Sequence, residues 1–305
     1  MRSTAVSTRD THGVLVTYRR PDALADHLGR LSRQSRPLAS LTIVDNDDDP
    51  AIASFVARSG TDAADRVRYV GLDANVGPAG GFRHGVSALI DELPDEDVIV
   101  LLDDDDPPWR DDTFERLVDT LDELRLDHPD IGGVGVFGAR LEGRGRLRVD
   151  DTAAPAPVHY LSGAGCPHYT VGALRSAPGP DPDLFFGFEE LDLGLALRRA
   201  GHTVWSSGLA RDHGCADYVR PSRAALGVSD PSWRRYYSVR NLITVLRRDG
   251  RTGEAVAVSA VAGLGKPMAN LVVRPRTAWA NLRLTAPAVL HAWWGRLGRR
   301  IEPAG

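Results

Sequence analysis

The sequence predicts an α/β protein with a mostly parallel sheet flanked by helices and with a helical C-terminal extension. The first observation is that short apolar runs alternate with helical patterns through the first third of the chain. Strands that alternate with helices form right-handed βαβ units, which place neighbouring strands parallel. The second observation is that the pattern is helical from residue 231 onward. We therefore expect an α/β domain over residues 1–230 and a helical region over 231–305.

Four strands are expected in the first part of the chain, and a helix follows each of them. The strands are GVLVTY (13–18), LTIVDN (41–46), RVRYVG (66–71) and VIVLLD (98–103). The helices are expected through Leu31, near 50–58, near 79–91 and from about Asp112. The strand ends at Thr17, Asp45, Asn75 and Asp103 should then lie at one edge of the sheet, where open α/β sheets bind ligands.

The second part of the chain differs in pattern. Residues 132–185 are rich in Gly and Pro with short strand-like pieces, as expected of functional loops on the sheet. A helix near 189–200 and a strand near 203–207 follow. Residues 231–249 and 252–298 are expected to be helical, with interruptions at Pro267, Pro275 and Pro287.

The composition limits the class of protein. The 305 residues are 42% hydrophobic and 26% charged, as in a soluble globular protein. The formal charge of −4 gives no basic footprint for nucleic acid. The two cysteines, Cys166 and Cys215, lack metal-ligand spacing, so neither a disulfide framework nor a zinc site is expected. Residues 1–12 lack the apolar core of a signal peptide, and no uncharged apolar run reaches membrane-spanning length, which predicts a cytoplasmic protein.

The most informative segment is VLLDDDDPP at 100–108, an apolar strand that ends in four aspartates and two prolines. Carboxylates packed this tightly repel one another unless a cation or solvent offsets them. A DxD pattern after a buried strand suits Mg²⁺ or Mn²⁺, because these ions take oxygen ligands and keep sites open for a diphosphate. The alternative is a solvated acidic turn that caps the helix near Asp112.

Two loops at the same edge suit nucleotide binding. In VDNDDDP (44–50), Asp45 and Asn46 can accept from and donate to a base such as uracil or thymine, and a helix N-cap cluster is the alternative. NVGPAGGFRHG (75–85) supplies glycines where backbone must approach a ligand, and it leads into a helix N-terminus that favours an anion. It is not a dinucleotide fingerprint, and a plain Gly-rich turn is its alternative.

The segment FFGFEELDLGLALRRAG (185–201) begins a helix with three carboxylates behind an aromatic cluster: Glu189, Glu190 and Asp192. Partly dry surroundings raise a carboxylate's proton affinity, and we expect Glu190 to act as a general base. Acidic residues also stabilise a first helical turn, and this ordinary role is favoured for Glu189 and Asp192.

Two later motifs contain candidate ligand-binding residues. Trp205 and His213 follow a strand in VWSSGLARDHG, from which the imidazole of His213 would turn toward a metal or diphosphate, unless it is a structural histidine. RRYYSVRN (234–241) gathers Arg235, Arg240 and two tyrosines on an expected helix. These residues suit diphosphate or acceptor contacts, or form an amphipathic helix face.

The order of these motifs resembles the family-2 glycosyltransferases, which are inverting nucleotide-sugar transferases with the Rossmann-like GT-A fold. The resemblance spans residues 13–245, and the ordered set is far more specific than any of its members. It rests on VLVTYRRPDAL (14–24), VDN (44–46), NVGPAGGF (75–82), LLDDDD (101–106), FFGFEELDL (185–193), His213 and YYSVRN (236–241). The resemblance implies a nucleotide-sugar half at about 13–106 and an acceptor half at about 132–230.

The resemblance also implies the site residues. Those expected to bind the donor are Thr17, Tyr18, Arg19, Asp45, Asn75, Gly80, Gly81, Asp103, Asp104 and Arg240. The expected metal ligands are Asp103, Asp105 and His213, with the DxD register open by one residue within 103–106. Glu190 aligns with the catalytic base, which is usually Asp in the family. Trp205 and Glu189 are expected to bind the acceptor.

The expected function is metal-dependent, inverting transfer of a sugar from a UDP- or dTDP-linked donor to a hydroxyl of a glycan, polyprenyl-linked or small-molecule acceptor. FFGFEE-like and YYxxRN-like segments are similar to those of bacterial rhamnosyl- and galactofuranosyltransferases of cell-wall or polysaccharide assembly. Two alternatives stay open: a sugar-nucleotide nucleotidyltransferase, and a non-catalytic sugar-nucleotide-binding or scaffold protein. The first would show a Gly-rich basic loop after the first strand, and the second would lack the DxD or the base, whereas both carboxylate motifs are present.

The C-terminal region combines tryptophans with arginines. Residues 274–300 contain Trp279, Trp293, Trp294 and six arginines, a mixture suited to an anionic membrane surface. The same mixture suits a packed C-terminal helix or a contact between subunits of a homo-oligomer. A peripheral position at the inner face of the membrane is therefore one of three expectations.

Overall fold

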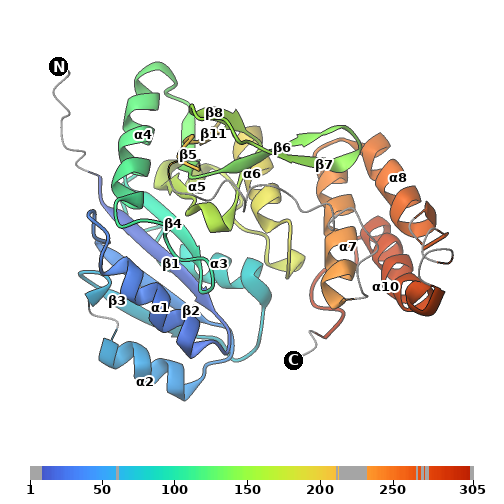
Figure 1. The fold of residues 1–305 in the computed structure, drawn as a ribbon, viewed down its shortest axis with the longest axis horizontal. Helices are drawn as coiled ribbons and strands as arrows, with labels where there is room; N and C mark the ends of the chain where they lie inside the picture. The colour runs from blue at the N-terminus through green and yellow to red at the C-terminus, as the bar shows by residue number, and fades with distance from the viewer. Residues whose placement is uncertain are drawn as a thin grey trace.

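The computed structural model describes residues 9–59, 62–210, 212, 232–265, 267–268, 271 and 275–302. Its main sheet has eight strands in the order β3-β2-β1-β4-β10-β5-β11-β8 (Figure 1). These strands are β1 (Thr11–Thr17), β2 (Ser40–Asp45), β3 (Val67–Gly71), β4 (Val98–Asp103), β5 (Ile131–Gly135), β8 (Ala156–Val158), β10 (His168–Thr170) and β11 (Thr203–Ser206). A second sheet has the order β7-β6-β9, with β6 (Gly138–Glu142), β7 (Arg146–Val149) and β9 (Tyr160–Leu161).

The sheet is mixed but mostly parallel in its first half, as predicted. Strands β1 to β4 pair parallel, and β11 pairs parallel with β5. The three-residue strand β10 runs antiparallel between β4 and β5, and β8 runs antiparallel beside β11. Both antiparallel strands come from the Gly- and Pro-rich segment, where the sequence predicted short strand-like pieces without an order.

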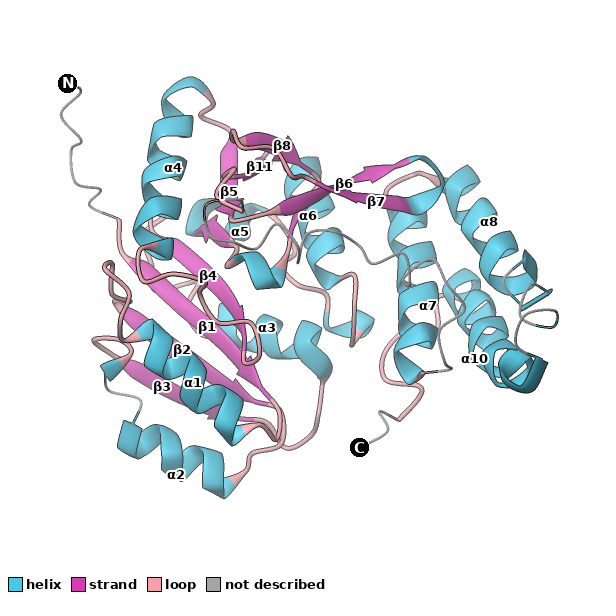
Figure 2. Cartoon of the chain, in the orientation of Figure 1, coloured by secondary structure: helices cyan, strands magenta, loops and turns pink. Residues whose placement is uncertain are grey.

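Helices cover both faces of the sheet (Figure 2). In the α/β part they are α1 (Pro21–Leu31), α2 (Pro50–Ser59), α3 (Gly77–Ser87), α4 (Thr113–Asp127), α5 (Val171–Ser176) and α6 (Glu189–Arg199). Side chains alternate along β1, so Leu15 packs in the core beneath α1, α2 and α4 while Val14 and Val16 pack beneath α3, α5 and α6. The helix predicted from about Asp112 is confirmed, since α4 begins at Thr113, directly after Asp112.

The C-terminal region contains α7 (Trp233–Arg248), α8 (Thr252–Ala260) and α10 (Pro275–Trp294), and α7 packs against both other helices. The hairpin of β6 and β7 reaches this region, where the Gly145 amide donates to the Glu254 carboxylate at 3.0 Å. Pro275 begins α10, but the predicted interruption at Pro287 is wrong because Pro287 lies inside that helix. Within the described residues, no helix combines the length and the apolar composition that crossing a bilayer needs.

Buried His168 on β10 makes one pH-dependent contribution to stability. Its Nδ1–H donates to the Cys166 carbonyl at 2.7 Å, and burial lowers its pKa to about 4. The unfolded chain therefore binds a proton at this histidine near pH 6.5, whereas the folded chain binds it only near pH 4. The contribution of neutral His168 to the free energy of unfolding is thus complete above pH 6.5 and is lost as the pH falls toward 4. We expect His168→Asn to reduce the difference in unfolding free energy between pH 7 and pH 5 by about 2 kcal/mol. Urea unfolding of both proteins at the two pH values measures this, and an unchanged difference would contradict it.

Candidate active site

The carboxyl ends of β1, β2 and β4 meet at one edge, where they bring together several predicted residues. In the sheet register Thr17 lies beside Asp45, and Val16 lies beside Asp103. Asp104 is buried and tied to the end of β1: its Oδ2 accepts from the Thr17 hydroxyl at 2.7 Å and from the Tyr18 amide at 3.4 Å. Burial raises the pKa of Asp104, and the contacts with Thr17 and Arg20 oppose that rise.

Arg20 joins the acidic run to the loop after β1. The sequence had instead indicated its neighbour Arg19 as a donor-binding residue. One guanidinium nitrogen of Arg20 contacts both Asp104, at 3.1 Å, and the exposed Asp105. Arg19 instead pairs with Asp47 on the surface. The two successive arginines after the first strand were the available signal for this contact.

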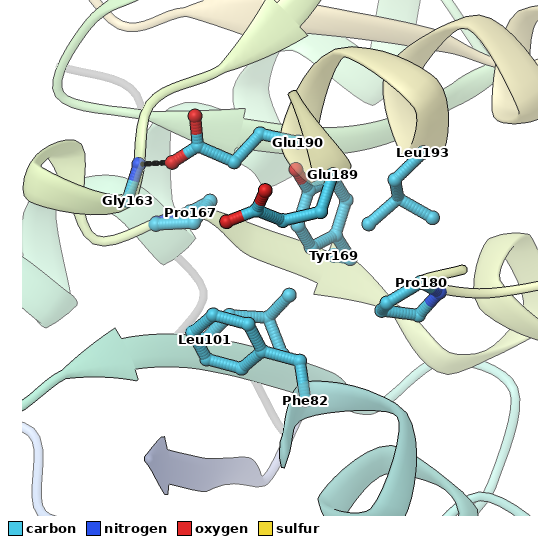
Figure 3. A pocket seen from close by; sticks show the side chains of 9 residues that line it. All are labelled: Phe82, Leu101, Gly163, Pro167, Tyr169, Pro180, Glu189, Glu190 and Leu193. Carbon is cyan, nitrogen blue, oxygen red and sulfur yellow. Dashed lines mark hydrogen bonds between the residues drawn. The ribbon is translucent and has the colours of Figure 1, made fainter. Parts of the chain in front are cut away.

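Asp103 and Glu190 approach each other across Gly163. The Gly163 amide donates to Glu190 Oε1 (Figure 3). A Cβ built on Gly163 would lie 2.8 Å from Glu190 Oε1 and 2.9 Å from Asp103 Oδ2. The glycine therefore lets two carboxylates from separate elements, β4 and α6, converge on one point. Gly163 was also missed, and its only sequence signal was the small-residue run SGAG at 162–165.

This convergence changes the ionisation of the carboxylates. Burial raises the pKa of Glu190, and the negative charge of Glu189 adds to the rise while the Gly163 amide opposes it. Burial also raises the pKa of Asp103 well above its usual range, and repulsion from Glu190 and Glu189 adds to it. A carboxylate with raised proton affinity beside a cavity has the property that a general base needs.

A pocket opens beside the two glutamates. Its other walls are mainly apolar and aromatic: Phe82, Leu101, Gly163, Pro167, Tyr169, Pro180 and Leu193. Figure 3 shows Glu189 and Glu190 at the start of α6, with Leu101 and Phe82 on the opposite side of the hollow. Glu189 Oε2 is buried and has no hydrogen-bond partner among the described residues. The pocket thus offers a hydrogen-bond acceptor that the fold itself leaves unused.

The loop before α6 is strained and is held from α7. Phe185 and Phe188 adopt positive φ angles of 63° and 70°, which are rare for residues with a side chain. Asn241 Nδ2 donates to the carbonyls of Leu184, Phe186 and Gly187 at 2.8–2.9 Å. These bonds fix the backbone that orients Glu189 and Glu190.

Arg240 shares this structural role, and the expectation that it binds the donor stays a prediction. Its side chain is fully buried, with guanidinium nitrogens donating to the carbonyls of Leu184 at 2.8 Å and Gly298 at 2.6 Å. The sequence showed a cation on a helix but not its burial, which depends on the C-terminal segment folding back over α7. Arg235, another arginine of that motif, contacts Asn281 of α10.

Replacing Asn241 with Ala should show that the loop is held for catalysis. The change leaves the carbonyls of Leu184, Phe186 and Gly187 without this donor, so we expect a loss of about 2 kcal/mol in unfolding free energy. It should also lower kcat, because Glu190 sits on the loosened loop. Urea unfolding and steady-state kinetics at a temperature where the variant is folded measure both effects, and an unchanged kcat would overturn the positioning role.

Asp45 and Asn46 make local contacts that hold the loop after β2. Asp45 is fully buried, and its oxygens accept from the amides of Asp47 and Asp49 and from the Tyr69 hydroxyl at 2.8 Å. Asn46 Nδ2 donates to the Gly77 carbonyl at 3.3 Å. Both Asp45 oxygens thus have partners within the chain, and its predicted contact with a base stays a prediction.

The glycines of 75–85 serve helix packing. A Cβ on Gly81 would lie 2.7 Å from a Val16 methyl, and one on Gly80 would lie 2.6 Å from a Val76 methyl. Gly81 thus lets α3 approach β1, and Gly80 makes room for the residue that precedes α3. Asn75 caps the same turn, since its Oδ1 accepts from the Gly77 amide at 2.8 Å.

Trp205 does not lie in the pocket. Its ring packs 4.7 Å from that of His128 and joins the core beneath α4, whereas Leu193 of α6 belongs to the core on the other face. Successive side chains of a strand point to opposite faces of the sheet, and the short sequence of β11 did not indicate which face Trp205 would take. His213 lies outside the described residues.

The residues at the site edge have the chemistry to hold a divalent cation. Asp103, Asp105 and Asp106 carry carboxylate oxygens along the acidic run, and burial together with repulsion from its acidic neighbours raises the pKa of Asp103. A bound cation would relieve that repulsion. A second group, Asp10, His12 and Asp97, lies at the opposite edge of the sheet. There the two ring nitrogens of His12 already contact Ser40 and Asp97, at 2.8 and 3.3 Å, so that group is a structural network.

Gly163→Ala tests the convergence of the carboxylates directly. The new methyl group would displace Glu190 or Asp103, and misplacement of a catalytic group by about 1 Å costs up to roughly 100-fold in rate. We expect kcat to fall between about ten- and 100-fold with little change in melting temperature. Gly143→Ala is the matched control, because nothing lies within 4 Å of its Cβ position. Equal activity of the two variants would contradict this geometry.

Comparison with known sequences gives consistent matches. The family model "Glycosyl transferase family 2" matches residues 14–168. Galactofuranosyltransferase GlfT1 of Mycobacterium tuberculosis (strain H37Rv) is 38% identical over 270 residues, covering 80% of this chain and 84% of that protein. Galactofuranosyltransferase GlfT1 of Mycolicibacterium smegmatis is 36% identical over 261 residues, covering 78% and 83%.

Solved structures share the architecture at low sequence identity. Mannosyltransferase PcManGT from Pyrobaculum calidifontis, in complex with GDP-Man and Mn²⁺, superposes with a TM-score of 0.53 at 15% identity, covering 95% of this chain and 89% of that one. Residues 1–349 of TarS from S. aureus, in complex with UDP-GlcNAc, superpose with a TM-score of 0.51 at 12% identity, covering 93% and 79%.

Proposed function

Because the chain belongs to glycosyltransferase family 2, and is thus a glycosyltransferase that acts on nucleotide sugars, we propose that it moves galactofuranose from a UDP-linked donor to a hydroxyl of a glycan acceptor. The fold is GT-A, as predicted. Membership in this family removes the nucleotidyltransferase and scaffold alternatives. The choice of galactofuranose rests on the two galactofuranosyltransferases that match about four fifths of the chain.

The observation that supports the chemistry is the meeting of Asp103 and Glu190 at Gly163. Glu190 would take the proton from the acceptor hydroxyl as its oxygen attacks the anomeric carbon. Its raised pKa favours this role, since a stronger base accepts the proton more readily. Attack from the face opposite the diphosphate inverts the anomeric configuration, and no covalent enzyme nucleophile is needed.

The donor would lie along the ends of β1 and β4. Thr17 and Tyr18 would line the nucleoside-binding part of the site. Asp104 holds both residues there, since it accepts from the Thr17 hydroxyl and from the Tyr18 amide. Asp103 and Asp105 would hold Mn²⁺ or Mg²⁺, with His213 as a further ligand. The bound ion would offset the charge that develops on the leaving diphosphate.

The acceptor would enter the pocket beside Glu189. Its apolar and aromatic walls suit the carbon face of a sugar ring, and the unpartnered Glu189 Oε2 suits a second acceptor hydroxyl. Glu189 would thus orient the acceptor while Glu190 removes the proton. These roles separate two neighbouring carboxylates that share one helix turn.

Thermal unfolding against a panel of donors tests the proposal. A ligand that binds only the folded chain raises its melting temperature. We expect the largest rise with UDP-galactofuranose and Mn²⁺, and smaller rises with UDP-galactopyranose, dTDP-rhamnose and GDP-mannose. A rise with dTDP-rhamnose alone would make the enzyme a rhamnosyltransferase. Retention of the anomeric configuration in the product, determined by NMR, would overturn the role of Glu190 as the base.

A further inference from the structure

Helix α10 has an unusual division of side chains between its two faces. The side chains buried against the protein are small or polar: Ala278, Asn281, Thr285, Ala288 and Ala292. The exposed side chains include the largest apolar ones, since Trp279 is 62% and Trp294 is 61% exposed. An ordinary surface helix has the reverse pattern, with its large apolar residues inward.

The exposed residues form one line along the helix. Arg276, Trp279, Arg283, Leu290 and Trp294 are all exposed, and their spacings of three, four, seven and four residues keep them on one face. We call these five residues the α10 stripe. It extends roughly 27 Å at 1.5 Å per residue. Of the eight large hydrophobic side chains exposed in the described part of the chain, seven lie between residues 256 and 294, so the stripe sits in the most apolar surface region.

The charge of this region has a single sign. No Asp or Glu occurs between residues 255 and 301, whereas this segment contains one lysine and six arginines. The Arg283 guanidinium lies 5.2 Å from the ring centre of Trp279, and that of Arg296 lies 5.1 Å from the ring of Trp294. Each exposed indole is thus accompanied by a cation, the combination favoured at the boundary between lipid headgroups and acyl chains.

We propose that the α10 stripe docks this enzyme on the surface of an anionic lipid bilayer. Its tryptophans and Leu290 would enter the boundary region while Arg276 and Arg283 contact anionic headgroups. A second copy of the chain fits this face poorly, because a symmetric contact would bring the same arginines together with no carboxylate on the helix to pair with them. This inference goes beyond sugar transfer and does not depend on the donor or the acceptor.

Flotation of the full chain with lipid vesicles tests the proposal. The probes are vesicles of phosphatidylcholine alone and of phosphatidylcholine with 30% phosphatidylglycerol, at low and high salt. We expect binding to the anionic vesicles that weakens with salt. Arg276→Glu with Arg283→Glu should weaken it by at least roughly 25-fold, since each arginine near the surface contributes about fivefold. Trp279→Ala with Trp294→Ala should weaken it roughly tenfold or more.

Two controls separate this surface from general attraction. Arg58→Glu with Arg66→Glu makes the same change in net charge on exposed residues of the α/β part, and Leu126→Ala removes an exposed apolar side chain from α4. Both should keep vesicle binding within about twofold of the unchanged protein, and circular dichroism should show all variants folded.

Absence of vesicle binding, or equal losses in the stripe and control variants, would overturn the proposal. A dimer in light scattering that the tryptophan variant abolishes, without vesicle binding, would assign the stripe to a second copy instead. Transfer to a soluble acceptor should be unchanged in the stripe variants. Failure of the vesicle test is therefore distinguishable from failure of the proposed donor or base.

Discussion

Replacing Glu190 with Gln is expected to lower the rate of sugar transfer about 1,000-fold while leaving donor binding intact. The amide keeps the size of the side chain but cannot accept the proton of the attacking hydroxyl. General-base catalysis contributes between about 100- and 10,000-fold in typical enzymes, so a loss in the middle of that range is expected. Single-turnover kinetics would measure the chemical step, and the melting-temperature rise with the nucleotide sugar would report donor binding.

Glu189→Gln is the matched control, because it changes the neighbouring carboxylate in the same helical turn. Glu189 lines the pocket without contacting Gly163, so we expect its variant to raise the KM for the acceptor and to change kcat less than tenfold. The reverse result, in which Glu189→Gln loses transfer and Glu190→Gln keeps it, would move the base to Glu189. The pair of variants therefore decides the assignment even if both lose some activity.

The sequence was most informative where one short segment determines both the structure and the chemistry. The run VIVLLDDDD predicts a buried strand and places acidic residues at its end, and the structure puts Asp103 and Asp104 there. The helix that begins at Glu189 was likewise predictable from its acidic first turn. These local signals do not depend on the rest of the chain.

Residues whose role depends on distant packing were not predictable. Arg240 resembled an anion-binding residue, but the C-terminal segment buries it and the carbonyls of Leu184 and Gly298 use its donors. Gly163 belongs to a short loop that matters only because β4 and α6 approach it from opposite sides. Pro287 lies inside α10, where the packing of that helix against α7 outweighs the local preference of proline for a helix end.

Asp103→Asn is expected to abolish metal-dependent donor binding and, at the same time, to stabilise the protein without ligand. Burial raises the pKa of Asp103, and repulsion from Glu190, Glu189, Asp105 and Asp106 adds to the rise. When the pKa of a carboxyl group is higher in the folded than in the unfolded chain, the free energy of unfolding falls as the pH rises above the unfolded value near 3.9. A neutral amide at this position therefore removes an unfavourable contribution to folding at pH 7. The melting temperature should rise by roughly 2–4 °C for each kcal/mol of repulsion removed.

Asp104→Asn is the matched control for the change of residue type. Burial raises the pKa of Asp104 as well, but its carboxylate accepts from Thr17 and Tyr18 and pairs with Arg20, so the amide also weakens three contacts and we expect a smaller rise in melting temperature than for Asp103→Asn. For Asp103→Asn we expect transfer to fall at least about 100-fold and the additional melting-temperature rise from Mn²⁺ with UDP to vanish. A stabilised Asp103→Asn protein that still responds to Mn²⁺ with UDP would move the metal to Asp105 and Asp106. A destabilised one would show that Asp103 supports the fold rather than the reaction. Because Asp103 lies among acidic neighbours whereas Asp104 has Thr17, Tyr18 and Arg20 as partners, the difference between the two variants separates a site suited to a cation from an acidic turn that merely tolerates its own charge.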